Sequence, residues 1–516
     1  MSKKTFYITT PIYYPSGRLH IGHLFTTTLA WVYKNYKCQQ GYDTFFATGI
    51  DEHGQKIQKK ALEFNIEPQE YVDNEAKQFE QLWKLLLIDY DSFNRTTNYH
   101  HHHAIQLIFD KMLKKGFIYK SYYEGLYSVS DEEFLTKSQA TFENNKYYHP
   151  ISHTELQEIK EESYFFDMKK FAPWIKEFFY NNPNFISNGA TYKELLNNFI
   201  NKGLEDLSIT RVSFDWGIPI LNNSNVKNHH VIYVWLDALF NYITFLGFLS
   251  DDETKYLKYW ENGDERVHLL AKEISRFHAI YWPIFLKALD LKLPTREVIH
   301  SWIITPEGKM SKSRGNVIDP LPLIEKYGAE EIKYFFISQI NIDSDFAFSE
   351  ELLVNVLNAD LANNFGNLLN RTIKMINQSF PDGTKYIATD LQKIDLNIYE
   401  LIKSIYTDYQ SEFDNFHADK ALKKSMELSK KLNEYIDKNE PWKLKADLKR
   451  LNVVLNTLQN GIYAVAFMLN VVIPNKTNKV LEFFKVNNFN EKNLFDFAKF
   501  DRKGPETSEI LFPRIK

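Results

Sequence analysis

The chain has 516 residues, of which 44% are apolar and 25% charged, a composition that excludes a disordered chain and suggests about three globular domains. The single cysteine, Cys38, excludes a disulfide framework and any zinc site with two or more thiolates. The longest nearly apolar run, 462–474, is shorter than a membrane span, and no apolar signal region precedes the first predicted strand. We therefore expect a reduced, cytoplasmic protein without a membrane segment.

The net charge of −4 is unevenly distributed. Residues 401–516 hold 20 Lys and Arg against 15 Asp and Glu, whereas the first 400 residues hold 42 against 51. This modest basic excess favours the C-terminal quarter as the part that contacts a polyanion. Composition alone does not identify the partner.

The first hundred residues predict the beginning of a doubly wound parallel sheet. Residues 5–10 form a β-branched and aromatic run, a helical pattern covers about 20–40 and ends at Gly41, and 43–49 predict a second strand before another helix near His53. Ligands of such sheets bind at the carboxyl ends of the strands. The loop before His20 and the segment 49–54 both lie at such ends.

The pattern changes twice further along the chain. Short aromatic segments and charged helical stretches between about 116 and 228 indicate an insertion into the sheet. Strands predicted at 231–235, 267–270 and 298–304 resume it. After about residue 355, apolar residues at helical spacing predict helices at 361–376, 397–413, 418–436 and 444–469, which together form a bundle.

Two histidines three residues apart lie at the predicted start of the first helix, in the segment PIYYPSGRLHIGH at 11–23. His20 and His23 share one helix face, and the N–H groups of a helix N-terminus favour a phosphate. Imidazole donors there can stabilise charge on a polyphosphate, and Gly22 leaves room for a flat base. Taken alone, such a pair is more often two packed helix residues.

A cationic loop, GKMSKSRGN, follows at 308–316. Lys309 and Lys312 between glycines suit a flexible loop that neutralises a departing pyrophosphate and then releases it. By itself, such a cluster is usually a solvated basic loop. Neither the G-x-x-x-x-G-K-[ST] string of a phosphate-loop ATPase nor G-x-G-x-x-G occurs in the chain.

Together these segments resemble the HIGH and KMSKS signatures of the class I aminoacyl-tRNA synthetases. Six further blocks occur in the order seen in the methionyl-tRNA synthetase family, and the resemblance extends from residue 6 to about residue 475. They are TGIDEHG at 48–54, RTT at 95–97, ESYFF at 162–166, YVWLDA at 233–238, RFH at 276–278 and EPWK at 440–443. Agreement at so many positions favours catalytic roles for His20, His23, Lys309 and Lys312.

The resemblance implies an α/β Rossmann-like catalytic domain with a connective insertion and a C-terminal all-α anticodon-binding bundle. The implied division is a first catalytic half at 1–115, a connective-peptide knuckle at 116–230, a second catalytic half at 231–300, a KMSKS and stem-contact region at 301–355 and the anticodon-binding domain at 356–516.

The resemblance also implies a methionine–tRNA ligase that activates L-methionine with ATP and transfers it to tRNA(Met), including the initiator. His20 and His23 would stabilise the triphosphate, Lys309 and Lys312 would neutralise pyrophosphate, and Mg²⁺ would bridge phosphate oxygens. The implied ATP site consists of Ser16, Gly17, His20, Gly22, His23, Lys309, Ser311 and Lys312.

The family's methionine pocket has matching positions in this chain. Asp51 would bind the substrate ammonium, although a carboxylate there could instead cap a helix. Aromatic walls suit a thioether, but without the resemblance Trp235 and Tyr242 would be assigned to the core. The implied pocket residues are Ile12, Tyr14, Asp51, Trp235, Ala238, Tyr242 and His278.

The predicted bundle carries residues that match the family's anticodon site. Asn367 and Arg371 are four apart on one helix, and Trp442 follows Pro441 at a predicted helix start. The family reads the CAU anticodon with an amide and a guanidinium for base edges and an indole for stacking. An exposed helix face and a buried tryptophan are the alternatives.

The insertion departs from the family pattern. Many members carry Cys-x-x-Cys near the YEGLYSV segment, whereas residues 127–133 here read YSVSDEE. Serine is a poor zinc ligand, so we expect no structural zinc and a knuckle held by aromatic residues. The histidine run 100–103 follows Asn98, a candidate N-cap, and predicts a helix start rather than a metal site.

Four other classes of function fit the sequence less well. Leucyl, isoleucyl and valyl enzymes carry a larger editing insertion, and a cysteinyl enzyme needs zinc-binding cysteines. A small-acid adenylating nucleotidyltransferase shares the HIGH-type signature but does not require a helical bundle. Intact histidines and lysines in both motifs disfavour a non-catalytic tRNA-binding protein. Some members of the family carry a separate C-terminal module for tRNA binding and dimerisation. This sequence extends only about 40 residues beyond the predicted bundle, so the resemblance leads us to expect a monomer.

Overall fold

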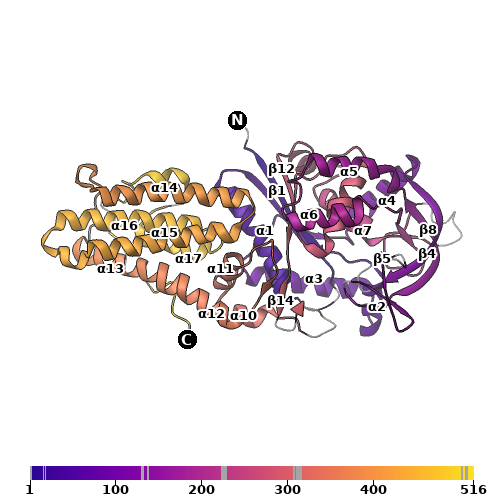
Figure 1. The fold of residues 1–516 in the computed structure, drawn as a ribbon, viewed down its shortest axis with the longest axis horizontal. Coiled ribbons are helices and arrows are strands. Elements are labelled where there is room, and N and C mark those ends of the chain that lie inside the picture. Colours follow the sequence, from indigo (N-terminus) through magenta and orange to yellow (C-terminus); the bar gives the residue numbers. More distant parts are fainter. Residues whose placement is uncertain are drawn as a thin grey trace. The chain divides into compact units, whose positions relative to one another are not determined.

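The computed structural model describes residues 3–15, 17, 19–129, 133–135, 137, 139–150, 152–221, 229–305, 308–309, 316–487, 489–500, 504–505 and 509–516 (Figure 1). The chain forms two compact units. The first contains Met1–Leu19, Asp43–Lys84 and Asp89–His300, and the second contains His20–Tyr42, Leu85–Ile88 and Ser301–Lys516. No helix within the described ranges is long and apolar enough to cross a membrane.

A five-stranded, fully parallel sheet organises the first unit. Its order is β13-β12-β1-β2-β3, so the strand order reverses at β1, and a ligand site is expected at the carboxyl end of that strand. The predicted strands at 5–10, 43–49 and 267–270 are confirmed. The five strands are β1 (Thr5–Tyr13), β2 (Asp43–Ile50), β3 (Ser92–Arg95), β12 (Glu265–Ala271) and β13 (Arg296–His300).

The central strand β1 is buried on both faces, which explains its run of aromatic and β-branched residues. Phe6, Tyr7 and Ile8 of β1 have no exposed surface. At the end of β2, Gly49 allows a close approach to β3, because a Cβ at this position would clash with the backbone oxygen of Asn94. The absence of a side chain therefore lets the ends of β2 and β3 pack closely, two residues before Asp51.

Helices connect the strands of the first unit. Asn98 caps the helix that contains the histidine run, since its side chain accepts a hydrogen bond from the His100 N–H at 2.9 Å, and the predicted helix start is confirmed. The helices are α2 (Gln55–Phe64), α3 (Pro68–Leu85, whose last residue belongs to the second unit), α4 (Tyr99–Lys114), α5 (Ala172–Asn181), α6 (Gly189–Leu195), α7 (Val234–Thr244), α8 (Thr254–Tyr256) and α9 (Trp282–Ala288).

The predicted strand at 231–235 is largely wrong. Only β11 (Val231–Ile232) is extended, and it pairs antiparallel with β10 (Thr210–Arg211) outside the parallel sheet. Tyr233 then caps α7, which carries the rest of the apolar run. A short apolar run does not distinguish a buried strand from a buried helix, and here the helix forms. The prediction at 298–304 likewise divides into β13 and β14 (Ile303–Thr305).

The insertion is built on a long antiparallel hairpin. β4 (Ile118–Ser128) pairs with β8 (Gln157–Phe166), flanked by β5 (Glu133–Leu135) and β9 (Leu207–Ser208), and β6 (Thr141–Glu143) pairs with β7 (Lys146–Tyr148). A small core of Leu126, Leu135 and Leu156, with Tyr147 against it, holds the tip. Aliphatic residues therefore contribute to the knuckle together with the aromatic ones. Ser130, Asp131 and Glu132 lie outside the described residues.

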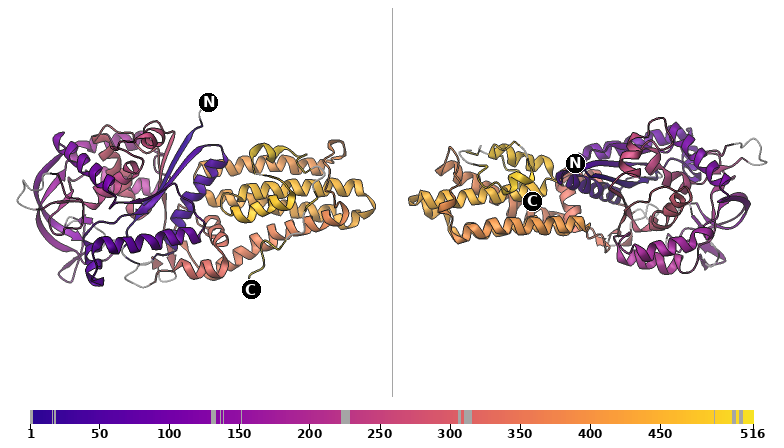
Figure 2. Two further views of the ribbon diagram at one scale, coloured as in Figure 1. Left: turned by 180° about the vertical axis from the view of Figure 1, so that it is seen from behind. Right: turned by 90° about the horizontal axis from the view of Figure 1, so that it is seen from above.

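The second unit contains the helical bundle. Figures 1 and 2 show α14, α15 and α16 side by side. Residues 451–469 of α16 are buried at every position, as expected for the central helix of a bundle. The predicted bundle helices are confirmed, but 361–376 begins within a π-helical turn, Leu357–Gly366. The helices are α10 (Pro320–Tyr327), α11 (Ala329–Gln339), α12 (Glu350–Val356), α13 (Asn367–Ser379), α14 (Lys393–Asp414), α15 (Ala418–Asn439), α16 (Leu448–Leu469), α17 (Pro474–Phe484) and α18 (Glu491–Phe495).

The first helix of the chain, α1 (Ile21–Gln39), also belongs to the second unit. Tyr36 stacks on Phe413 of α14 with ring centroids 4.5 Å apart, and the Asn35 amide donates to the backbone oxygen of Val471 at 3.1 Å. A three-stranded sheet, β15 (Gly308–Lys309), β14 and β16 (Phe346–Ala347), completes the unit. No strand follows Ala347 within the described part of the chain.

Candidate active site

The carboxyl ends of β1 and β2 place two of the predicted pocket residues side by side. Ile12 is in register with Gly49, and the Asp51 N–H donates to the backbone oxygen of Tyr13 at 2.9 Å. Asp51 is buried, and the residue that caps α2 is Gly54, so the helix-cap alternative for Asp51 is excluded. Tyr14 is half-buried and packs against the cluster formed by α2 and α3.

Three further predicted pocket residues lie on α7, and the fourth faces them from the turn at Phe277–Tyr281. The Trp235 indole stacks on Phe277 with ring centroids 3.7 Å apart and meets the edge of His278 at 6.1 Å. Ala238 and Tyr242 follow on α7, and both are buried. Sequence reasoning missed Phe277, although it lies within the RFH block that identified His278.

A directed hydrogen-bond chain connects Tyr242 to His278. The two atoms Tyr242 Oη and His278 Nε2 are 2.7 Å apart, and His278 Nδ1 is 3.0 Å from the backbone oxygen of Ile274. Because a carbonyl oxygen only accepts, Nδ1 carries the proton, and Nε2 accepts from the tyrosine hydroxyl. Burial lowers the pKa of His278 to about 4, partly opposed by that carbonyl, so the imidazole is neutral.

Asp51 also influences Tyr242 electrostatically. Burial raises the pKa of Tyr242 well above its ordinary value, and the negative charge of Asp51 adds to this rise. The pocket therefore combines a carboxylate with a neutral aromatic lining. This arrangement suits an amino acid with a free ammonium group and an uncharged side chain.

Acidification should destabilise the protein through His278. An unfolded histidine binds its proton near pH 6.5, whereas His278 binds it near pH 4, so the unfolded state holds more protons between these values. Stability should fall by about 3 kcal/mol as the pH decreases through this window. Urea unfolding from pH 7 to pH 4.5 measures the effect, with His278→Gln as the control. An identical pH dependence in both proteins would contradict the assignment.

His20 and His23 cap the N-terminus of α1 reciprocally. His20 Nδ1 accepts from the Gly22 N–H at 3.1 Å, and His23 Nδ1 accepts from the His20 N–H at 3.1 Å. A neutral imidazole that accepts at Nδ1 carries its proton on Nε2. Both rings therefore have an Nε2–H donor of the kind that a phosphate oxygen accepts. A Cβ at Gly22 would lie 2.8 Å from the His20 ring, so a larger residue there would displace the capping imidazole.

The segment that follows the cationic loop contacts the N-terminus of α1. Lys309, in β15, is opposite Ile304 of β14, and the Ile21 N–H donates to the backbone oxygen of Ile318 at 3.1 Å. One hydrogen bond therefore joins the start of α1 to the segment that follows the cationic loop, within the second unit. Gly17 lies in a bend. The predicted ATP-site residues Ser16, Ser311 and Lys312, and the side chain of Lys309, lie outside the described residues.

The predicted anticodon residues lie near one another in the second unit. The Arg371 guanidinium is 5.8 Å from the centre of the Trp442 ring, a cation–π distance. Trp442 is 45% exposed at the start of the 3-10 helix Pro441–Ala446, which excludes a buried tryptophan. Asn367 is exposed one turn before Arg371 on α13. The ring of Trp442, with Arg371 beside it, is therefore accessible at the surface of the second unit.

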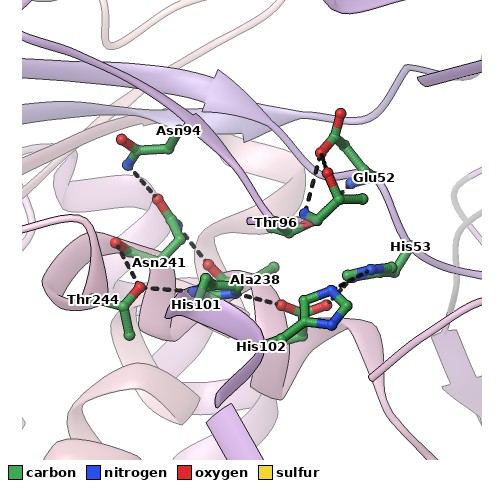
Figure 3. A network of polar contacts seen from close by, with 11 residues as sticks. Glu52, His53, Asn94, Thr96, His101, His102, Ala238, Asn241 and Thr244 are labelled. Atoms are coloured by element: carbon green, nitrogen blue, oxygen red, sulfur yellow. Dashed lines mark hydrogen bonds and ion pairs between the residues drawn. The ribbon is translucent and has the colours of Figure 1, made fainter. Parts of the chain in front are cut away.

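A buried polar network in the first unit was missed by sequence reasoning (Figure 3). It joins His53 and His101 to Asp237 of α7. Asp237 lies between Trp235 and Ala238, and His53 is two residues after Asp51. The residues of this network therefore occur in sequence segments already singled out. Asp237 and His53 lie in the two blocks that identified the pocket, and His101 lies in the histidine run that was interpreted only as a helix start.

Comparisons with known proteins agree on one family. The family model described as "tRNA synthetases class I (M)" matches residues 6–150 and 140–373. The chain is 53% identical over 514 residues to the methionine–tRNA ligase of Mycoplasmopsis pulmonis, covering 100% of both, and 43% identical to that of Enterococcus faecalis, covering 100% of this chain and 78% of the relative. The solved Mycobacterium tuberculosis methionyl-tRNA synthetase in complex with methionyl-adenylate has a TM-score of 0.93 and 30% identity, over 99% of this chain and 100% of that one.

Proposed function

This chain belongs to the methionyl-tRNA synthetase family of class I tRNA synthetases, and from that membership we propose how its residues carry out the reaction. The protein is a methionine–tRNA ligase. It activates L-methionine with ATP to methionyl-adenylate and transfers the methionyl group to the 3′ end of tRNA(Met), for initiation and elongation. The roles of its residues follow from the geometry described above.

The reaction proceeds in two displacements. The methionine carboxylate attacks the α-phosphorus of ATP, the bond to the bridging oxygen breaks, and pyrophosphate leaves with that electron pair. The 2′- or 3′-hydroxyl of the terminal tRNA adenosine then attacks the activated carbonyl, loses its proton and displaces AMP. No covalent enzyme intermediate forms, so catalysis consists of positioning and electrostatic stabilisation.

The methionine pocket is assigned to the residues around Asp51. Its carboxylate binds the substrate ammonium, and Tyr242 and His278 contact the side chain together with the remaining pocket residues. The observation that carries this assignment is a buried carboxylate at the ends of β1 and β2, together with the buried, hydrogen-bonded Tyr242–His278 pair. An unbranched thioether matches such a lining, because sulfur–aromatic contacts are favourable. The assigned residues are Ile12, Tyr14, Asp51, Trp235, Ala238, Tyr242 and His278.

The ATP site is assigned to the two signature segments. His20 and His23 donate from Nε2 to the triphosphate, and Lys309 and Lys312 neutralise the departing pyrophosphate. The reciprocal capping of α1 supports the histidine roles, since it leaves the protons on Nε2. Mg²⁺ enters with the nucleotide as the Mg·ATP substrate, with phosphate oxygens as its main ligands. Ser16, Gly17, Gly22 and Ser311 complete the site.

Binding of the tRNA anticodon is assigned to the helical bundle. Three of its residues, Asn367, Arg371 and Trp442, contact the CAU anticodon of tRNA(Met), including the initiator, through base edges and stacking.

We also propose that the protein acts in the cytoplasm as a monomer and that its knuckle holds no zinc. Gel filtration at micromolar concentration should give the mass of one chain, and a zinc stoichiometry near one per chain would contradict the metal-free knuckle.

Amino-acid-dependent exchange of pyrophosphate into ATP tests the proposed function. Methionine should support the exchange better than other sulfur or aliphatic amino acids. A higher rate with leucine or cysteine would contradict the specificity. Absence of exchange with every amino acid would favour a tRNA-binding protein without catalysis.

Lys312→Ala should strongly reduce this exchange while the protein remains folded. The lysine charge opposes the charge that develops on pyrophosphate, and removing one such stabilising group typically costs about 10²–10³-fold in rate. The exchange rate and the thermal unfolding temperature are measured on the same preparation. A variant that keeps the wild-type rate would exclude Lys312 from catalysis.

A further inference from the structure

A buried carboxylate connects three elements of the first unit. Asp237 Oδ2 is 2.6 Å from His53 Nδ1, and Asp237 Oδ1 is 2.6 Å from His101 Nε2. The side chain of Asp237 has no exposed surface, and those of His53 and His101 are almost completely buried. The carboxylate therefore joins α7, the segment after β2 and α4 through two short, charge-assisted hydrogen bonds.

The outer nitrogens of both imidazoles are also bound. His101 Nδ1 is 2.7 Å from Thr244 Oγ1, and His53 Nε2 is 3.1 Å from His102 Nε2 (Figure 3). Burial, reinforced by His53, lowers the pKa of His102 to about 4, so His102 is neutral. These contacts fix the orientation of each ring that faces Asp237.

Further hydrogen bonds hold the segment after β2 and the helix α7. The Glu52 N–H donates to Thr96 Oγ1 at 2.9 Å, which anchors the segment after β2. On α7, the Asn241 amide donates to the backbone oxygen of Ala238 at 2.5 Å and accepts from the Asn94 amide at 2.8 Å. Asp237 is thus the charged centre of a network that links the ends of β2 and β3 to the first turns of α7.

Both linked segments carry residues of the proposed methionine pocket. Asp51 precedes His53 by two positions, and Trp235 and Ala238 flank Asp237 on α7. We propose that Asp237 is a positioning residue of the methionine site, which holds the ammonium-binding Asp51 in register with the side-chain pocket by binding His53 and His101 together. This inference rests on the proposed function and deepens it.

A negative charge at Asp237 is needed for this role. Burial by itself raises the pKa of the carboxyl, but His53 and His101 lower it below its usual value, so Asp237 is ionised. A side-chain amide has one acceptor oxygen and an NH₂ group that only donates, so Asp237→Asn cannot accept from both rings on two oxygens, and the ring that faces the NH₂ group must change its tautomer to keep a hydrogen bond. The substitution therefore keeps the shape of the side chain and removes the double acceptor.

Kinetics of ATP–pyrophosphate exchange by the full chain test the proposal. In Asp237→Asn, the KM for methionine should rise about tenfold or more, since a small misplacement of Asp51 weakens ammonium binding, while the KM for ATP stays the same. His101→Phe removes one of the two bonds and provides a second variant if the first does not fold. It should raise the KM for methionine by a smaller factor.

Asp395→Asn is the matched control. Asp395 is a completely buried aspartate in the second unit, held by Arg450 at 2.5 and 2.9 Å, so its loss should destabilise the protein without changing either KM. If the Asp237 and His101 variants lose stability as Asp395→Asn does and retain both KM values, or raise both KM values equally, the proposal is wrong. Wild-type protein without methionine-dependent exchange would instead contradict the proposed function.

Discussion

Replacing His20 with asparagine should reduce methionine-dependent pyrophosphate exchange about 10²–10³-fold while the protein stays folded. Asparagine is among the best N-cap residues, so its side chain can still accept from the Gly22 N–H that His20 Nδ1 now binds. The variant loses the Nε2–H that we assign to the triphosphate. The loss should therefore appear in kcat, with little change in the KM for methionine.

Two comparisons separate the catalytic and the capping roles of His20. His20→Ala should show the same kinetic defect and an additional loss of about 1 kcal/mol in the free energy of unfolding, the usual contribution of an N-cap. His417→Asn changes another half-buried histidine that precedes a helix, α15, and should leave exchange unaffected. Wild-type exchange in His20→Asn would show that His20 is a cap and not a catalytic group.

Replacing Trp442 with alanine should impair tRNA charging and leave adenylate formation nearly intact. Stacking of a base on an aromatic ring contributes about 1–3 kcal/mol, so kcat/KM for tRNA(Met) should fall about 5- to 150-fold. Trp442 is exposed, and its loss opens no cavity in the core. Aminoacylation of tRNA and pyrophosphate exchange are measured in parallel.

The conservative variant Trp442→Phe should recover part of the charging activity, because phenylalanine keeps a stacking face beside Arg371. Leu448→Ala, at a nearby exposed apolar residue, is the control and should charge normally. An equal loss of charging and exchange in Trp442→Ala would show that the residue supports the fold rather than the anticodon.

Much of the architecture was predictable because it depends on local patterns. The capping of α4 by Asn98 follows from the preference of asparagine for that position, and the bundle helices follow from apolar residues at helical spacing. The strand prediction at 231–235 was wrong because tertiary packing, and not a local pattern, decides the structure there. Tyr233 could continue a strand or cap a helix, and only its packing selects the helix.

The sequence by itself determined the family and the reaction, because short signature segments identify both, and the residues of the site stay a prediction from the same segments. Tertiary structure decided which of these side chains are connected. Asp237 binds His53, 184 positions away, and His101, 136 positions away. Folding also determined that α1 packs with the helical bundle in the second unit. Such contacts depend on the packing of distant segments, which no local pattern of residues specifies.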